Sequence, residues 1–276
     1  MTDTWVLLAI GAALGMVIGL LGGGGGILAV PILVAVGEPF LVASSQSLVI
    51  VGAGAAAALV PHHRARRVDW RVGLTFGALG AIGAAVGSRM ATYVAPAVLL
   101  GGLTVLLIGG AVTMIRSALG EQSRAETNAL HRAEAETDVA PVPDGEEAPP
   151  SAPGVGGRIR IVTLASAVGL VTGLLGVGAG FIVVPALVGA MRLPIKKATA
   201  TALVVIVMNS AVAAAVRHGS QGSLGVTLGL AAASATFAVL GALLSRRIPG
   251  WVLSAAFAAL MILVAIYTVV HTLLTS

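Results

Sequence analysis

Residues 20–31 read LLGGGGGILAVP, and residues 174–185 read LLGVGAGFIVVP. A shift of 154 positions, from residue 20 to residue 174, superimposes the spaced glycines and the closing proline of the two stretches. Both stretches lie inside long apolar runs. Hydrophobic segments that glycine or proline interrupts at corresponding positions of two halves are typical of substrate sites in membrane transporters. The aligned pairs are Gly22 and Gly176, Gly24 and Gly178, Gly26 and Gly180, and Pro31 and Pro185.

The composition indicates an integral membrane protein. Of the 276 residues, 57% are hydrophobic and 10% are charged, whereas soluble domains contain about 25% charged residues. The mean hydropathy is +1.02. A helix needs about 20 apolar residues to cross the hydrocarbon of a bilayer. Candidate membrane runs are residues 5–21, 40–60, 70–88, 94–115, 160–175, 198–216, 224–245 and 251–273.

Charge and cysteine content narrow the function classes. The net charge is +5, yet the basic residues lie in short loops between apolar runs, where orientation in the membrane accounts for them. We therefore predict no nucleic-acid partner. The chain has no cysteine, which excludes disulfides and thiolate metal ligands. Residues 1–5 carry no basic residue, so we expect the first apolar run to be retained rather than cleaved as a signal peptide.

Residues 118–157 separate two membrane halves. This segment holds eight of the 11 acidic residues, and its end, residues 141–157, is rich in proline and glycine. Such a composition is typical of a disordered, solvated linker. We therefore divide the chain into an N-terminal membrane repeat (1–117), an acidic linker (118–157) and a C-terminal membrane repeat (158–276).

The basic residues predict how the repeats are oriented. If each glycine stretch is a kink in one spanning helix, the 16 lysines and arginines divide ten to six between the two sides of the membrane. If each stretch reverses the chain, they divide fourteen to two, with Arg89 and Arg217 on the minority side. The positive-inside rule favours the second arrangement. The repeats are then inverted, with the linker cytoplasmic and both termini outside.

The predicted fold is an all-α polytopic membrane protein with two inverted repeats. Each repeat is expected to contain about four transmembrane helices and one glycine-broken re-entrant half-helix. The half-helices are residues 27–36 and 181–190. At 1.5 Å per residue each is about 15 Å long, which is too short to cross the membrane.

The glycine stretches predict an anion site. Glycine adopts positive φ without penalty and lets other groups approach the backbone. We expect short helices to begin near Ile27 and Phe181, and their first N–H groups would have no intrahelical partner. These donors and the helix dipole attract anions. Close helix packing is the alternative use of small residues, but matched glycines and prolines favour the site. We assign the six aligned glycines to substrate binding and the two prolines to structural breaks.

Polar residues follow each glycine stretch. Ser45, Gln46 and Ser47 follow the first, and Thr199 and Thr201 follow the second. Their hydroxyls and amide can donate to anion oxygens. They can equally cap helices or hydrogen-bond between helices. We include all five in the candidate substrate site.

One amide lies within an apolar run and completes the candidate site. Asn209 aligns with Gly54 of the first half, and a buried amide needs a partner, either a neighbouring helix or a ligand. No Asp or Glu lies inside a predicted span, whereas intramembrane carboxylates usually mark cation or proton paths. An anion therefore fits better than a metal cation as substrate. We predict no metal site, no cofactor and no catalytic residues, because motifs such as His-Glu-x-x-His and Gly-x-Ser-x-Gly are absent.

These residues resemble the sulfite exporter TauE/SafE family of bacterial membrane transporters. The pattern LLGxGxGxxxxP in both halves looks like its repeated signature, and residues 197–203, KATATAL, are similar to its A-x-G/A-T-S-L segment. The first copy departs at Gln46, where threonine is usual, and the second at Ala202, where serine is usual. The resemblance covers nearly the whole chain outside residues 118–157.

The resemblance implies a secondary transporter of the bacterial inner membrane that exports sulfite, an organosulfonate or a related oxyanion by alternating access. Its partners would be a small anionic substrate, the lipid bilayer and a coupling proton or sodium ion. Backbone carbonyls at broken helices can bind sodium even without acidic residues. The sequence leaves open a homo-oligomer. The alternatives are transport of another small organic acid and a non-transporting membrane scaffold that binds partners through residues 118–157.

Overall fold

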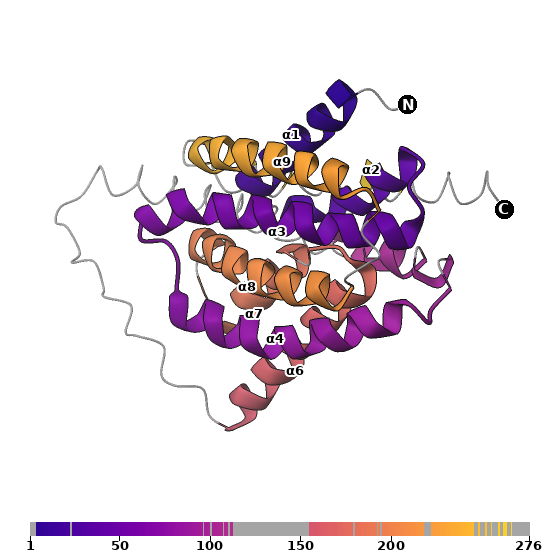
Figure 1. Cartoon of the computed structure of the whole chain (residues 1–276). Helices are drawn as coiled ribbons and strands as arrows, with labels where there is room; N and C mark the ends of the chain where they lie inside the picture. The colour runs from indigo at the N-terminus through magenta and orange to yellow at the C-terminus, as the bar shows by residue number, and fades with distance from the viewer. Residues whose placement is uncertain are drawn as a thin grey trace.

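The computed structural model describes residues 4–22, 24–95, 97–99, 101–106, 108–109, 111–112, 155–178, 180–191, 193, 195–217, 222–245 and 248, and positions 252, 255, 259, 262, 263 and 266 of the last apolar run. Every regular element within these residues is a helix, as the all-α prediction requires. Figure 1 shows the helices packed side by side in a bundle, with α3 and α8 near its middle.

The two halves repeat one order of elements. In the first half the order is α1 (Thr4–Leu21), the 3-10 helix η1 (Gly24–Leu28), α2 (Ala29–Ala35), α3 (Phe40–Arg64) and α4 (Trp70–Ala91). In the second half it is α6 (Val155–Leu175), α7 (Gly180–Met191), α8 (Ile195–Val216) and α9 (Leu224–Leu244). Each half therefore has a long helix, a glycine break, a short helical segment and two further long helices.

Four of these helices are long and apolar enough to cross a membrane. They are α3, α4, the part of α8 from Lys196 to Val216, and α9. The apolar portions of α1 and α6 are shorter, at Leu7–Leu21 and Ile161–Leu175. All six agree with apolar runs predicted from the sequence.

Helices of opposite halves contact each other backbone to backbone through glycine. A Cβ atom built on Gly19 of α1 would lie 2.1 Å from the carbonyl oxygen of Ala238 in α9. A Cβ atom built on Gly173 of α6 would lie 2.1 Å from the carbonyl oxygen of Ala84 in α4. Such close packing of membrane helices depends on small residues. The same reciprocal pattern joins Gly15 to Ser234 and Gly169 to Gly80.

The register of these contacts gives the helix directions. In each helix pair the residue numbers rise together, so α1 is parallel to α9 and α6 is parallel to α4. Along α4, Gly73 faces Val204 and Gly77 faces Met208, so α8 is parallel to α4 as well.

Helix α3 runs in the same direction as α9. Gly222, just before α9, lies near Val42 at the start of α3. The Ser234 hydroxyl donates to the Ile50 carbonyl oxygen over 3.4 Å, and Leu243 and Pro61 line one groove near the ends of both helices. Since α1 and α3 are thus parallel, the chain must run back between Leu21 and Phe40, through η1 and α2 (Figure 1).

The short segments differ in detail from the prediction. Ile27 lies inside η1, so the first helical turn begins at Gly24, and α2 covers Ala29–Ala35 rather than 27–36. Successive glycines tolerate the tighter 3-10 turn because they have no side chains to eclipse. The second segment, α7, matches 181–190 within one residue at either end.

The end of the predicted linker also differs. Helix α6 begins at Val155, inside the range 118–157. Adding residues to the end of a formed helix needs no new nucleus, so α6 extends beyond its apolar run. Residues 118–154 lie outside the described residues, as do most of 251–273 and parts of 94–115.

Close contact at Gly19 predicts a large cost for one added methyl group. Gly19→Ala should lower the free energy of unfolding by about 1–3 kcal/mol, because the Ala238 carbonyl is backbone and cannot easily move. The control is Gly229→Ala in α9, where no atom of the described residues lies within 4 Å of the added atom. Thermal unfolding of both variants in detergent measures the difference. Equal melting temperatures would contradict the proximity of α1 and α9.

Candidate functional site

Each glycine break begins at a residue in the left-handed region. Gly22 has φ +64° and Gly176 has φ +65°, which only glycine adopts without strain. A Cβ atom on Gly22 would lie 1.8 Å from Cγ2 of Thr199, and one on Gly176 would lie 1.9 Å from Oγ of Ser44. Each break therefore packs against the first turns of the long helix that follows the other break.

The two breaks meet between the middles of α3 and α8. A Cβ atom on Gly26 would lie 3.0 Å from the carbonyl oxygen of Gly178 and 2.9 Å from Cγ1 of Val51. A Cβ atom on Gly178 would lie 2.3 Å from the same Val51 atom and 3.6 Å from Cγ2 of Ile206. The structure thus brings together glycine stretches that are 154 positions apart in the sequence.

The remaining aligned residues belong to the short segments. Gly24 begins η1, and Gly180 begins α7, where its N–H donates to the Gly178 carbonyl oxygen over 2.6 Å. Pro31 is buried in α2, and Pro185 lies in α7. The two prolines therefore lie within the short helices rather than at their ends.

The polar residues after the first break differ in their partners. The Ser45 hydroxyl donates to the Leu41 carbonyl oxygen of its own helix over 2.8 Å. Gln46 and Ser47 are fully buried, and within the described residues their side-chain polar atoms have no hydrogen-bond partner. The Gln46 amide nitrogen faces Gly222, 3.0 Å from where a Cβ atom would lie.

The polar residues of the second half are spread along α8. Thr199 covers Gly22, as described above. The Thr201 hydroxyl accepts a hydrogen bond from the backbone N–H of Asp69 over 3.0 Å, which ties the start of α8 to the start of α4. Asn209 lies two turns further along α8, where its amide atoms lie 2.8 and 2.9 Å from the Cβ position of Gly80 in α4. Thr201 and Asn209 therefore contact α4 rather than the glycine breaks.

Buried polar atoms without partners are expensive. Both amide atoms of Asn209 and the hydroxyl of its neighbour Ser210 are buried and, among the described residues, unpaired. Ser210 packs on Gly52 in α3, and the sequence analysis did not single it out. Each unpaired buried group costs about 1–3 kcal/mol. Gln46 and Ser47 of α3 and Asn209 and Ser210 of α8 are thus buried polar residues whose donors and acceptors are unused within the described residues, as is expected of residues that bind a polar ligand.

Arg217 is a functional candidate that the sequence analysis missed. It follows α8, is 3% exposed, and its guanidinium donates to the Ser44 hydroxyl and to the carbonyl oxygens of Gly173 and Leu174, the last over 2.9 Å. All three acceptors are neutral. Burial lowers the pKa of Arg217 to about 10, so the side chain stays charged at neutral pH.

Arg217 ties the second glycine break to α3. Ser44 also donates to the Leu175 carbonyl oxygen over 2.9 Å, so three helix ends converge one residue before Gly176. The position of the first half that corresponds to Arg217 is His62, 155 residues earlier, just as Ser44 precedes Thr199 by 155. The charge distribution could have indicated this residue, because Arg217 is one of two basic residues on the less basic side of the membrane in the predicted topology.

Metal-binding groups are not concentrated in this region. Within the described part of the chain, no three His, Cys, Asp or Glu side chains come together. The site is therefore built from glycine backbone, uncharged polar side chains and one buried arginine.

Comparison with known proteins identifies the family. The sulfite exporter TauE/SafE family matches residues 7–268, which include both glycine breaks. The chain belongs to the TauE/SafE family. A "probable membrane transporter protein" of Xylella fastidiosa strain 9a5c is 32% identical over 206 residues, which cover 73% of this chain and 69% of that protein. A protein of the same description from strain Temecula1 is 31% identical over 204 residues, with the same coverage of both chains. No solved structure matches.

Membership of the TauE/SafE family makes the protein a membrane transporter. The match agrees with the four membrane-length helices and with the resemblance noted from the glycine signature. The relatives are described as transporters without a named substrate.

Removal of the Arg217 charge should destabilise the fold. Arg217→Met keeps most of the side-chain volume but leaves the Leu174 carbonyl oxygen without the donor of Arg217, and the Gly173 carbonyl oxygen with the Ser88 hydroxyl alone. The expected loss is about 1–3 kcal/mol for each acceptor left unpaired. Arg89→Met is the control, because Arg89 lies exposed in the last turn of α4 and such substitutions change stability by about 0.5 kcal/mol or less. Equal unfolding temperatures of the two variants would rule out a clamping role for Arg217.

Proposed function

We propose that this TauE/SafE protein is a secondary transporter that exports a small anion by alternating access. The substrate class is sulfite, an organosulfonate or a related oxyanion, held at the paired glycine breaks. The observation that carries the proposal is the meeting of Gly26 with Gly178 between α3 and α8, two helices that also carry buried polar groups without partners among the described residues. Irregular backbone at membrane depth is tolerated where it lines a substrate site.

Reciprocal contacts support an inverted-repeat architecture. Contacts between α1 and α9 recur between α6 and α4 with both partners shifted by 154 residues, as for Gly19 with Ala238 and Gly173 with Ala84. Helices α3 and α8 correspond to each other and run in opposite directions. A two-fold axis perpendicular to these helices has this effect, and in a bilayer such an axis lies in the membrane plane. The short segments η1–α2 and α7 would then be re-entrant from opposite sides.

The distribution of charge supports a cytoplasmic location for one end of the bundle. Basic residues between α3 and α4 lie near Lys197 at the start of α8 around one cavity. Arg89 and Arg217 lie at the opposite ends of α4 and α8. The positive-inside rule assigns the more basic end to the cytoplasm. Residues 118–157 are then cytoplasmic, and both termini are outside.

The chemistry of the site favours an anion. The described acidic residues, Glu38 and Asp69, lie outside the helices, so no carboxylate within the described spans repels an anion. Backbone N–H groups at the start of a helix such as α7 attract negative charge. The Gln46 amide and the Ser47 hydroxyl add neutral donors, and Arg217 adds a fixed positive charge beside the second break. Neutral donors such as the Gln46 amide and the Ser47 hydroxyl bind an oxyanion reversibly.

Flux in proteoliposomes tests the transport proposal. Vesicles would contain sulfite, sulfate, a sulfonate or a small carboxylate, with and without a pH gradient. We expect efflux of one anion class and its loss in Gly178→Leu, because a side chain there collides with Val51 where the breaks meet. Gly101→Leu is the control, since among the described residues no atom lies within 4 Å of its Cβ position. Full flux in Gly178→Leu, or no flux of any anion by folded wild-type protein, would refute the proposal.

A substitution of Gln46 distinguishes an effect on substrate binding from an effect on folding. Gln46→Leu replaces a buried amide, which has no hydrogen-bond partner in the described part of the chain, by an apolar side chain of similar size, so the unfolding temperature should stay the same or rise. If the amide contacts the substrate, the flux of that anion should fall at least tenfold, since a lost hydrogen bond to a charged group is worth about 1.5–3 kcal/mol. The control is Thr236→Ala, because Thr236 is exposed on α9 and its hydroxyl donates to the Ala232 carbonyl oxygen of its own helix. Unchanged flux in Gln46→Leu would remove this residue from the site.

A further inference from the structure

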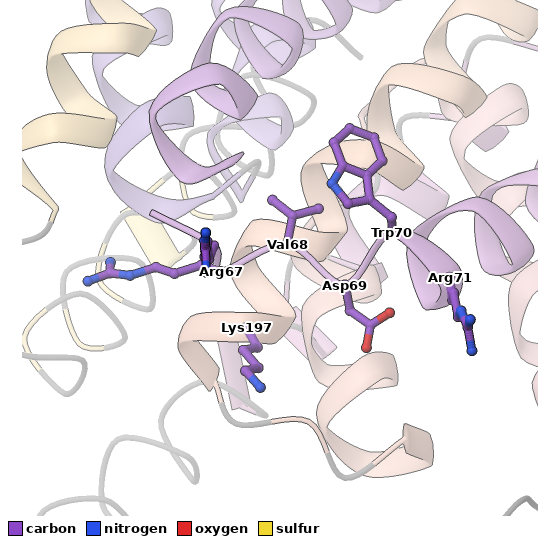
Figure 2. A pocket seen from close by; sticks show the side chains of 7 residues that line it. Arg67, Val68, Asp69, Trp70, Arg71 and Lys197 are labelled. Atoms are coloured by element: carbon purple, nitrogen blue, oxygen red, sulfur yellow. The ribbon is translucent and has the colours of Figure 1, made fainter. Parts of the chain in front are cut away.

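A second polar cavity lies at the basic end of the bundle, where α3 ends and where α4 and α8 begin. An open cavity of about 220 Å³ is lined by the loop between α3 and α4, the first residues of α4, and α8. Its charged lining consists of four cations and one carboxylate: Arg66, Arg67, Arg71, Lys197 and Asp69. Figure 2 shows Lys197, Asp69 and Arg71 pointing to the same side of the loop.

The one carboxylate in this cavity, Asp69, already takes part in local structure at the start of α4. Asp69 is the N-cap of α4, and its Oδ1 accepts from the Val72 N–H over 3.1 Å. Its own backbone N–H donates to the Thr201 hydroxyl of α8 over 3.0 Å. Asp69 therefore links the start of α4 to the start of α8 beside the cavity. Because the lining contains four cations and one carboxylate, its net charge is positive.

Arg66 occupies a backbone position that favours glycine. Its φ is +52°, and it is the one non-glycine residue with positive φ among those described. The Arg66 N–H donates to the His63 carbonyl oxygen and the Arg67 N–H to that of His62, which is the hydrogen-bond pattern of a Schellman helix end. Glycine is usual at this position because a side chain is strained there. An arginine held at this cost lines the cavity, which indicates a role for its charge.

The cavity lies at one end of the membrane-length helices. Three membrane-length helices end or begin at it: Phe40–Arg64, Trp70–Ala91 and Lys196–Val216. Trp70, on its rim, is 40% exposed, as is common for tryptophan at the membrane interface. Near the same end of α3, a largely apolar groove of about 260 Å³ runs between α3 and α9, lined by Val60, Pro61, Arg64, Val239 and Leu243. Such a groove suits an acyl chain.

We propose that this cavity binds the phosphate oxyanion of an anionic phospholipid headgroup. The cations are opposite in sign to the single negative charge of a phosphodiester. Clusters of Lys and Arg next to membrane helices attract anionic lipids by about fivefold in affinity for each charge. A soluble oxyanion shares this chemistry, but the position at the ends of three spans and the neighbouring apolar groove favour a lipid.

Fluorescence of Trp70 tests the proposal directly. The chain has three tryptophans, so Trp5→Phe with Trp251→Phe leaves Trp70 as the reporter. Trp70 is anchored at the cavity by a hydrogen bond of 3.2 Å from its Nε1 to Nδ1 of His63. The protein is placed in phosphatidylcholine nanodiscs that contain either brominated phosphatidylglycerol or brominated phosphatidylcholine at equal mole fraction. Bromine quenches a nearby tryptophan, so we expect stronger quenching by the anionic lipid.

Substitutions identify the groups responsible. Arg71→Gln and Lys197→Gln should each reduce the preference for the anionic lipid by about fivefold. Arg89→Gln, at the other end of α4, should leave it unchanged. Arg66→Gly should weaken the preference by a similar factor while the unfolding temperature stays the same or rises, because glycine fits φ +52° without strain. A purely structural role of Arg66 predicts the opposite pair of results.

The outcomes distinguish the possible occupants. Equal quenching by both brominated lipids, with no response to added phosphate or sulfite, overturns the oxyanion site. A response of Trp70 to free phosphate or sulfite without any lipid preference overturns the lipid assignment in favour of a soluble anion. Anion flux measured in the same variants tests the transport proposal separately, since loss of the lipid preference does not require loss of flux.

Discussion

Helices of opposite halves approach each other to backbone contact because glycine has no side chain. Gly15 and Gly19 allow this approach between α1 and α9, and Gly169 and Gly173 allow it between α6 and α4. These contacts bring the ends of α1 and α6, where the breaks begin, into the middle of the bundle. The left-handed residues Gly22 and Gly176 then turn the chain against α8 and α3, respectively. Without these close contacts the two glycine stretches could not meet.

In the centre of the bundle the helices pack tightly, yet several buried polar side chains have no hydrogen-bond partner among the described residues. Gly26, Gly178 and Val51 are in close contact, whereas Gln46 and Asn209 are buried without partners among the described residues. A fold selected only for stability would replace these amides with apolar side chains, since each costs free energy. Arg217 adds a buried charge whose acceptors are all neutral. Such features are expected where a transporter must bind a polar solute and then release it.

Local patterns predicted some residues of the candidate site better than others. The glycine alignment correctly indicated which segments would be irregular, because a positive φ and a missing Cβ are properties of the residue itself. It did not indicate that the Ser45 hydroxyl bonds to Leu41 or that Thr201 accepts from Asp69, because a hydroxyl has several acceptable partners and packing selects one. Arg217 was missed for the same reason: an arginine after a helix looks like a loop residue until the burial around it is known.

The sequence by itself determined the membrane class, the helical runs, the repeat of 154 residues and the family, since hydropathy and glycine spacing are properties read along the chain. Only the tertiary structure decided that Gly26 faces Gly178, that Ser44 and Arg217 clamp the second break, and that Arg66 and Lys197 share one cavity. These contacts join residues far apart in sequence. They depend on helix direction and on side-chain packing, which residue type and spacing do not encode one position at a time.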